Sequence, residues 1–567
     1  MKKSFKAFAA ALLALALVMS ATLTAFGNDG IRVVIDGLEW QFDEDMTPFV
    51  HDGRVFLPIR GIADVFGIPI EWEQDTNTVH VGWHLFDTGR DQDADSLLRI
   101  AHYTLPWSFD PIDAHVSVNA MGVRQIFDTL VVMDHDTMTV MPSLAAEWHM
   151  PDPRTVEISL RQDVYFHDGY SLTAHDVQYS LHRAAAAEQL DVFLGMISHV
   201  EVHDWYELTI HLAHDFAPII YHLAHPTASI VPAYYHEMYL EWGMATGTGP
   251  FMLMNFWSGD SAIWMDTNFR YWGNVPQFDM LRFESFSHSI DAVIYGWADI
   301  ALDVHPLDME WVRELDDITM LVDLSMSFDY IGINTAMSPW DNPAAVRAVS
   351  YAIDIESIFD SIFEEAFAPT VSPLARRLSG YTGLPPFEVD LDRAAELLAQ
   401  AGLSDGFGIT IAYNTHSSFR GLVAEHVARD LAQIGIEAKI ISLEWPEFLD
   451  ATARGEFDIY VLGWNNPLLN KDYGLFYLFH SSAHGHAGNR TFHNNPQVDA
   501  LLDAARAEID SEARAVLYNQ VLQLLRENPT VLPLGQGQYR IGISGRVAGF
   551  VPNPAGYHRF ADVHFTE

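Results

Sequence analysis

The sequence predicts an α/β protein built from two lobes with a cleft between them, preceded by a small α+β module. Helical and strand patterns alternate with short connections over residues 390–464, as in a doubly wound lobe. The earlier half of the chain supplies a second lobe, and the strand pattern at 529–544 is expected to return to it. Two lobes joined by crossing strands imply a cleft that closes on a ligand by a hinge motion.

Composition excludes several classes of function. The 567 residues include 31 Lys and Arg against 76 Asp and Glu, which gives a formal net charge of −45. Such a surface repels phosphate backbones and anionic lipid heads, so nucleic acid is not an expected partner. The chain has no cysteine, which excludes disulfides, thiolate metal sites, cysteine nucleophiles and lipid attachment at a lipobox cysteine.

Residues 1–27 have the pattern of a secretory signal peptide. Lysines near the start precede an apolar segment at 7–19, and small residues at 25–27 suit cleavage. The apolar segment is short for a membrane span, with an uncleaved anchor as the alternative. We therefore expect an exported protein that is periplasmic, or extracellular and associated with the cell wall, and that is not a lipoprotein.

Residues 28–84 are predicted to form a separate module. Alternating residues at 31–42 and 70–83 predict two hairpins, with a short helix between them at about 59–66. The stretch "GRVFLPIRGIADVFGIPIEWEQDTNTVHV" resembles the copper amine oxidase N-terminal-like domain, a module of secreted and wall-associated bacterial proteins. The resemblance implies no metal ligand, and it raises attachment to the cell wall as one role. A polar, acidic linker is expected at 85–96.

Two His-Asp doublets within residues 164–181 raise the question of a metal-dependent hydrolase site. The first doublet belongs to a His-Asp-Gly turn that follows two alternating strands. The second opens a helix in which Thr173 and Asp176 have the form of a capping box. A hydrolase of the His-Asp type places its doublet within a helix, with further ligands on other helices. The turn and the helix cap are therefore the favoured interpretation.

Several blocks of the chain, in the same order, resemble the family 5 extracellular solute-binding proteins. This family contains the oligopeptide-, dipeptide- and nickel-type receptors of ABC importers. The resemblance starts with "PSLAAEWHMPDPRTVEISLRQDVYFHDGYSLTAHDVQYSLHRA" at 142–184. It continues with "GTGPFML" at 247–253, "NFRYWGNVPQFDMLRF" at 268–283 and "YIGINTAMSPWDNPAAVRAVSYAID" at 330–354. Two later segments, "LDRAAELLAQAGLSDGFGITIAYN" and "LAQIGIEAKIISLEW", complete a match that spans roughly 97–567.

The resemblance implies a periplasmic-binding-protein-like fold with a hinge, an interlobe cleft and an inserted subdomain. Lobe I would comprise about 97–325 and 525–567, and lobe II about 326–524. The family also implies a receptor that has no cofactor and delivers a small-molecule or peptide ligand to the permease of an ABC importer. We expect the protein to be a monomer.

The elements of lobe II can be placed in order. Helices are predicted at 390–402, 420–435 and 446–455, and strands at 409–414, 436–445 and 457–464. Leu391, Ala395 and Leu398 are expected to line the buried face of the first helix.

Ligands of such lobes collect beyond the carboxyl ends of the strands, where Asn414, Trp445 and Trp464 stand. Trp464 offers a large rigid ring to a ligand, and core packing is the alternative that the residues leave open. The resemblance favours ligand contact. The predicted ligand-binding residues are Trp464, Asn465, Asn466, Asn414, Arg420, Thr248, Phe109 and Tyr330.

The chain departs from the dipeptide receptors of the family at both charged anchors. Those receptors place an Asp shortly after the Gly-Trp pair for the ligand amine, and Pro467 stands there in this chain. They place an Arg for the ligand carboxylate near the position of Asn414, where the nearest Arg is Arg420. Asp472 is expected to be a solvated loop residue, with contact to a cation as the alternative. Free dipeptides are therefore expected to bind poorly, whereas longer peptides remain open.

Histidine is abundant, with 27 residues, and full protonation would change the formal charge from −45 to −18 (−45 + 27). The run "HSSAHGH" makes His480, His484 and His486 the candidate metal ligands. The family takes up nickel largely as small chelates, so a nickel or metal-chelate receptor is an alternative function.

The chain carries no G-x-S-x-G motif and no phosphate loop, and "HEMYL" lacks the second His of a zinc-protease helix. An enzyme is therefore not expected. The other alternative is a wall-associated surface protein in which the N-terminal module is the functional part. The prediction is an exported solute-binding receptor whose ligand is a small polar molecule, with a peptide favoured.

Overall fold

The computed structural model describes the N-terminal region through six short strands and the rest of the chain through residues 96–233, 245–255, 262–362, 367–378 and 387–566. Contacts divide the chain into two compact units, Met1–Asp91 and Gln92–Glu567, and each unit is described by itself. The predicted signal peptide and nearly all of the predicted linker lie outside the described residues.

The N-terminal unit contains three pairs of antiparallel strands. They are β1 (Val33–Ile35) with β2 (Leu38–Trp40), β3 (Phe49–His51) with β4 (Arg54–Phe56), and β5 (Ile70–Glu73) with β6 (Thr78–Val81). The first and third pairs occur where the sequence predicts hairpins. The helix predicted at about 59–66 lies outside the described residues.

The larger unit is built on one long mixed sheet. Its strand order is β14-β15-β16-β7-β17-β23-β18-β22-β20-β21, and β19 pairs with β23. One half consists of β14 (Phe251–Asn255), β15 (Ala262–Thr267), β16 (Met280–Ser285), β7 (Leu97–His102) and β17 (Ile300–Ala301). The other half consists of β22 (Ile459–Asn465), β20 (Phe407–Asn414) and β21 (Ile436–Leu443). The strands between them are β18 (Ile318–Ile333), β23 (Val531–Ser544) and β19 (Phe367–Pro369).

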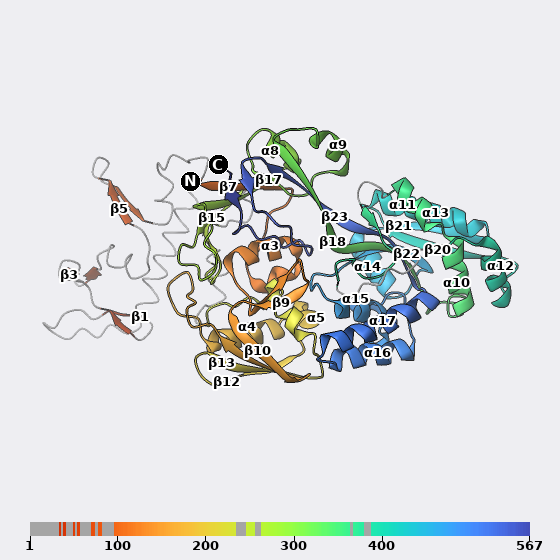
Figure 1. Ribbon diagram of the computed structural model, residues 1–567, viewed down its shortest axis with the longest axis horizontal. Helices are drawn as coiled ribbons and strands as arrows, with labels where there is room; N and C mark the ends of the chain where they lie inside the picture. Colours follow the sequence, from red (N-terminus) through yellow and green to blue (C-terminus); the bar gives the residue numbers. More distant parts are fainter. Residues whose placement is uncertain are drawn as a thin grey trace. The chain divides into compact units, whose positions relative to one another are not determined.

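The two longest strands, β18 and β23, connect the halves of the sheet, and Figure 1 shows both passing from one group of elements to the other. Their register shifts between Leu324 and Phe328, where three residues of β18 oppose the single Gly537 of β23. A Cβ on Gly537 would lie 2.6 Å from the Ser327 Oγ and 2.8 Å from the Ser325 Oγ, so the bulge closes tightly there. A bulge of this kind bends the strand pair, which makes the crossing a suitable position for the predicted hinge. The lobe boundaries remain predictions.

Helices cover both halves of the sheet. The first half carries α3 (Ser117–Ile126), α8 (Ser289–Ile294) and α9 (Met309–Val312). The second half carries α10 (Pro343–Ala352), α11 (Ile355–Ile362), α12 (Leu391–Gln400), α13 (Ser418–Ala432) and α14 (Trp445–Ala453). They are followed by α15 (Lys471–Phe479), α16 (Pro496–Ala507) and α17 (Ser511–Glu527).

The predicted order of helices and strands over residues 390–464 is confirmed, since α12, β20, α13, β21, α14 and β22 follow one another in that sequence. The predicted buried face of α12 is partly wrong. Ala395 is exposed, and Ala394, Leu397 and Leu398 form the buried stripe instead. The buried stripe follows the spacing i, i+3, i+4 from Ala394, and Leu391 in the first turn is only half-buried.

A separate antiparallel sheet has the order β10-β11-β13-β12 and its own buried core. Its strands are β10 (Ala145–Asp152), β11 (Thr155–Leu160), β12 (Ile197–Val202) and β13 (Glu207–Leu212), and α4 (Ala174–Ala185) packs against β12. The predicted capping box at the start of α4 is confirmed, with the Thr173 amide donating to Asp176 Oδ2 at 2.8 Å. His167 of the first doublet has a structural partner, since its Nε2 lies 3.0 Å from the Gly249 carbonyl oxygen.

Shorter elements complete the unit. They are η3 (Pro111–His115), β8 (Val131–Asp134), β9 (Thr139–Pro142), η4 (Glu188–Leu190), α5 (Asp191–Leu194), α6 (Ile219–His222), η5 (Pro226–Ala228), η6 (Pro306–Asp308), η7 (Ser481–Ala483), η8 (Gly485–Ala487), β24 (Val547–Ala548) and β25 (His564–Phe565). Across the described part of the chain, no helix combines the length and the apolar character needed to cross a bilayer.

Candidate ligand-binding site

The end of β22 has no described strand partner along one edge. β22 pairs with β18 along its whole length, from Ile459 to Asn465. On its other side it pairs with β20 only at Ile459 and Tyr460. Among the described strands, no partner covers that second edge from Val461 onward. An uncovered strand edge can accept an extended segment of another chain through backbone hydrogen bonds.

Two polar side chains at this end of the strand have atoms that lack a partner. Trp464 is half-buried, its ring centroid lies 5.4 Å from that of Tyr473, and its buried Nε1 has no hydrogen-bond acceptor within the described residues. Asn466 is buried; its Nδ2 donates to the Asn470 carbonyl oxygen at 2.5 Å, but its Oδ1 is likewise unpartnered. Asn465 is exposed. Buried polar atoms of this kind normally bind water or a ligand.

Asn414 and Arg420 come together as the sequence predicts, and the structure adds a third residue that sequence reasoning missed. Arg420 of α13 donates from NH1 to the Asn414 Oδ1 at 2.9 Å and from Nε to the Asp329 Oδ1 at 2.8 Å. The guanidinium thus lies across β22 at Gly463 and joins β20 to β18. Burial raises the pKa of the Asp329 carboxyl, although Arg420 opposes this rise. A lone Asp between Phe328 and Tyr330 in an apolar strand was the available signal.

Gly463→Ala is expected to displace Arg420 and weaken ligand binding. An alanine Cβ would lie 2.7 Å from the Arg420 NH2 and 3.3 Å from the Asp329 Oδ1, so the guanidinium must shift away from β22 at this position. A matched control is Gly408→Ala in β20, where the added Cβ meets nothing nearer than 3.8 Å. Calorimetric titration with the bound ligand should show a loss of about tenfold for Gly463→Ala and little change for the control. Equal affinities in both variants would contradict this role of the glycine.

Three predicted ligand contacts are packed in the protein interior. Phe109 is 4 % exposed and packs on Gly122 of α3, and Thr248 is fully buried with its Oγ1 donating to the Asp128 Oδ2 at 3.0 Å. Tyr330 is 1 % exposed and points to the face of β18 opposite Asp329, because successive residues of a strand alternate. A ligand reaches these side chains only if their surroundings move, so their role as contacts stays a prediction.

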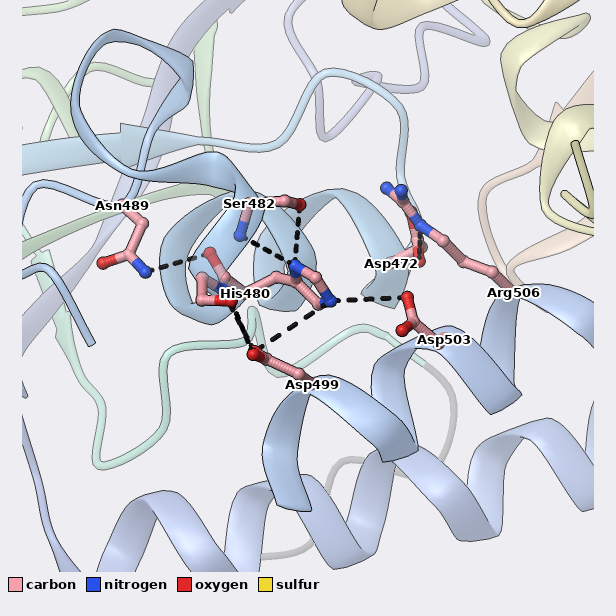
Figure 2. A network of polar contacts seen from close by, with 8 residues as sticks. Asp472, His480, Ser482, Asn489, Asp499, Asp503 and Arg506 are labelled. Atoms are coloured by element: carbon pink, nitrogen blue, oxygen red, sulfur yellow. Dashed lines mark hydrogen bonds and ion pairs between the residues drawn. The ribbon is translucent and has the colours of Figure 1, made fainter. Parts of the chain in front are cut away.

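The prediction that Asp472 is a solvated loop residue is wrong. Asp472 stands in the first turn of α15 and its side chain is 1 % exposed. Arg506 of α16 donates from Nε to both carboxylate oxygens at 3.0 and 3.1 Å and from NH2 to Oδ2 at 2.8 Å, as Figure 2 shows. The cation that Asp472 faces is therefore part of the protein.

The three histidines of the predicted metal loop do not converge. The His480 ring stacks on Phe476 at 4.3 Å, and its Nε2 lies 3.3 Å from the Asp503 Oδ1 (Figure 2). His484 Nε2 lies 3.0 Å from the carbonyl oxygen of His493, and His486 is exposed. No group of three His, Cys, Asp or Glu side chains in the described part of the chain is placed to hold a metal ion. The short η7 and η8 turns separate the histidines and direct them to different partners.

Comparison with protein families matches two segments. Residues 139–486 match the bacterial extracellular solute-binding proteins, family 5 middle domain, and residues 34–84 match the copper amine oxidase N-terminal domain. Both matches lie where the sequence shows the corresponding resemblance.

Similar proteins and structures share most of the larger unit. Heme-binding protein A of Haemophilus influenzae is 26 % identical over 501 residues, covering 81 % of this chain and 90 % of that protein. The dipeptide-binding protein of Escherichia coli is 26 % identical over 480 residues, covering 77 % of this chain and 88 % of that protein. The structure of HbpA2 from Haemophilus parasuis superimposes with a TM-score of 0.76 at 25 % identity, covering 83 % of this chain and 100 % of that one.

A second solved structure is the periplasmic binding protein DppA of Helicobacter pylori in complex with the peptide STSA. It gives a TM-score of 0.69 at 24 % identity and covers 84 % of this chain and 99 % of that one. The predicted periplasmic-binding-protein-like α/β fold is confirmed by these neighbours. Since the family 5 match spans well over half of the sequence, this chain belongs to the bacterial extracellular solute-binding proteins of family 5.

Proposed function

We propose that this family 5 protein is an extracytoplasmic receptor of an ABC importer, that it captures a peptide between two lobes, and that it delivers the peptide to a membrane permease. The observation that carries the peptide assignment is the uncovered edge of β22 beside Trp464. A peptide supplies alternating backbone donors and acceptors along such an edge, and its side chains occupy the spaces on either side.

The relatives support a peptide ligand. The Escherichia coli relative is named a dipeptide-binding protein, and the Helicobacter pylori structure holds the peptide STSA. The chain's named relatives are binding proteins, which agrees with capture of a ligand and not with catalysis. In this proposal the ligand's termini are not held by the Asp and Arg anchors of the dipeptide receptors, so peptides longer than two residues are preferred.

The remaining assignments are part of the proposal. The protein acts in the periplasm or at the cell exterior as a monomer, and the N-terminal module retains it at the cell wall. No specific observation favours the nickel-chelate alternative, because the histidines of the predicted metal loop have separate partners.

The experiment is native mass spectrometry of the purified protein, followed by identification of anything released on denaturation. A co-purified peptide, or a change of Trp464 fluorescence with a mixed-sequence pentapeptide pool that is absent in Trp464→Phe, is the expected result. A nickel-histidine chelate that binds while the pool does not would replace the peptide assignment with the metal-chelate one. If neither the peptide pool nor the nickel-histidine chelate shows saturable binding, both the peptide and the metal-chelate assignments are rejected.

A further inference from the structure

We infer that the receptor binds the carboxylate of its ligand through Arg490 and provides no charged partner for the ligand amine. The inference rests on the proposed peptide-receptor function. It concerns a residue outside the predicted ligand set.

Arg490 is connected to the Trp464 ring through Gly488. Its amide donates to the Gly488 carbonyl oxygen at 2.8 Å, and Gly488 packs so closely on the Trp464 ring that an added Cβ would lie 3.2 Å from it. Tyr460 and Trp464 share one face of β22 because they are four residues apart along the strand. The Arg490 guanidinium acts electrostatically on Tyr460 and on Tyr330, its neighbour across the sheet.

Two donors in this region lack an acceptor. The Arg490 Nε and the Trp464 Nε1 are both buried, and neither has a hydrogen-bond partner within the described residues. Tyr460 is only 2 % exposed and its hydroxyl lies by that of Tyr330, whereas Arg490 is half-buried and so retains access to a ligand. Unpartnered N–H groups around a guanidinium suit a carboxylate, which accepts several hydrogen bonds and neutralises the charge.

Two other arginines near the end of β22 are already neutralised. Arg420 is held by Asp329 at 2.7 Å, with the side chains only 13 and 10 % exposed. Arg506 is held by Asp472 at 2.8 Å, with exposures of 11 and 1 %.

Arg490 makes no ion pair with any carboxylate in the described part of the chain. Lys471, at the start of α15, also has a buried Nζ without a hydrogen-bond partner within the described residues, but the charged group that acts on it is Arg514 of α17. Of the three arginines, Arg490 is therefore the one that remains available to an anionic ligand group.

The same pairs remove the carboxylates that would bind an amine. Asp329 and Asp472 are occupied by their arginines, and Asp503 lies against His480. Pro467 takes the place that the family's dipeptide receptors give to an acidic residue. The site is therefore asymmetric within the described residues: Arg490 offers a positive group to one terminus of a peptide, whereas these three carboxylates already have partners.

The experiment compares four versions of one mixed-sequence pentapeptide pool, with free or acetylated amino termini and free or amidated carboxyl termini. Binding to the full chain is measured by calorimetric titration. Amidation is expected to weaken binding by about tenfold or more, as for loss of a hydrogen bond to a charged group, and acetylation by less than about threefold. A pool whose amidated form binds as well as the free acid overturns the inference, and so does a loss of about tenfold on acetylation alone.

Variants locate the effect. In Arg490→Gln the preference for the free carboxylate should disappear, whereas Arg490→Lys should keep part of it because the charge remains. Arg454→Gln, which removes an exposed arginine paired with Asp450, is the control for net charge. If Arg490→Gln still prefers the free carboxylate over the amide and its melting temperature is unchanged, another group binds the carboxylate and the assignment is wrong. If none of the four pools binds, the peptide-receptor function fails, and this inference fails with it.

Discussion

Lowering the pH from about 7.5 to about 5 is expected to remove several kcal/mol of folding stability, because four buried imidazoles resist protonation in the folded protein. Burial is the main cause that lowers their pKa from the ordinary value of 6.5. The pKa falls to about 4 for His222, His493 and His558, and to about 3 for His225. Each of the four is at most 3 % exposed.

The contacts of these rings explain why protonation is unfavourable in the folded protein. His225 Nδ1 accepts the Thr227 amide at 3.2 Å, and His558 Nδ1 accepts the Asn553 amide at 3.0 Å. A proton on either nitrogen would remove that hydrogen bond and leave a charge among aromatic rings. His222 has its Nδ1 against a carbonyl oxygen, but its Nε2 has no partner within the described residues that could share a second proton.

The direction of the effect follows from which state binds more protons. Below pH 6.5 an unfolded imidazole takes up a proton, whereas the folded one does so only near pH 4 or lower. The unfolded state therefore binds more protons in this window, and stability is complete above the unfolded pKa and falls as the pH drops through it. At about pH 5 each imidazole lowers the free energy of unfolding by about 2 kcal/mol, and the four together lower it by on the order of 8 kcal/mol. The total free energy of unfolding of a native protein is typically about 5–15 kcal/mol, so this loss is a large part of it.

Urea denaturation of the full chain over a pH series measures this loss directly. His222→Gln should flatten the pH dependence by about one proton. A free energy of unfolding that is the same at about pH 7.5 and about pH 5 would show that these histidines are not neutral in the folded state.

Local sequence patterns predict the helices and strands of this chain well, but they do not predict contacts between distant residues. The alternation over residues 390–464 predicts six elements in the right order, because hydrophobic periodicity is a local property. The error at Ala395 is a shift of one residue, since the buried face of α12 passes through Ala394 and the neighbouring Ala395 is exposed. The position of Trp464 at a strand end also follows from local pattern alone.

The partners of the site residues could not be predicted, since they come from distant parts of the chain. Asp329 and Arg420 are 91 residues apart, and only the adjacency of β18, β22 and β20 brings them together. The histidines of the predicted metal loop show the opposite case. They are close in sequence, but two successive turns send their side chains to different neighbours. Spacing predicts a shared site only where the backbone between the residues is regular.

Asp472→Ala is expected to destabilise the protein by about 3–5 kcal/mol, because it leaves the Arg506 charge buried without a partner. Burial alone would lower the pKa of the Arg506 guanidinium, but Asp472 and Tyr477 together outweigh burial and raise it. The guanidinium also lies 3.1 Å from the centre of the Phe476 ring and 5.0 Å from that of Phe216. These surroundings offer aromatic faces but no second carboxylate within the described residues.

The pair joins α15 to α16 close to the separate sheet β10-β11-β13-β12. The Arg506 carbonyl oxygen accepts the Ala217 amide at 2.7 Å, and Leu468, from the loop after β22, is buried in the core of that sheet. Asp472 lies next to Tyr473, which packs on Trp464. Loss of the pair should therefore loosen the loop that carries the proposed ligand contacts, and ligand affinity should fall together with stability.

A double-mutant cycle separates the ion pair from the packing. Asp472→Ala alone should be more damaging than Asp472→Ala combined with Arg506→Met, because the double variant removes the stranded charge and keeps an apolar side chain against Phe476. Asp450→Ala, which breaks an exposed pair with Arg454, should cost less than about 1 kcal/mol. If chemical denaturation shows equal losses for Asp472→Ala and Asp450→Ala, the buried pair is no more important to the fold than a surface one. Its link to the ligand loop would then have to be abandoned.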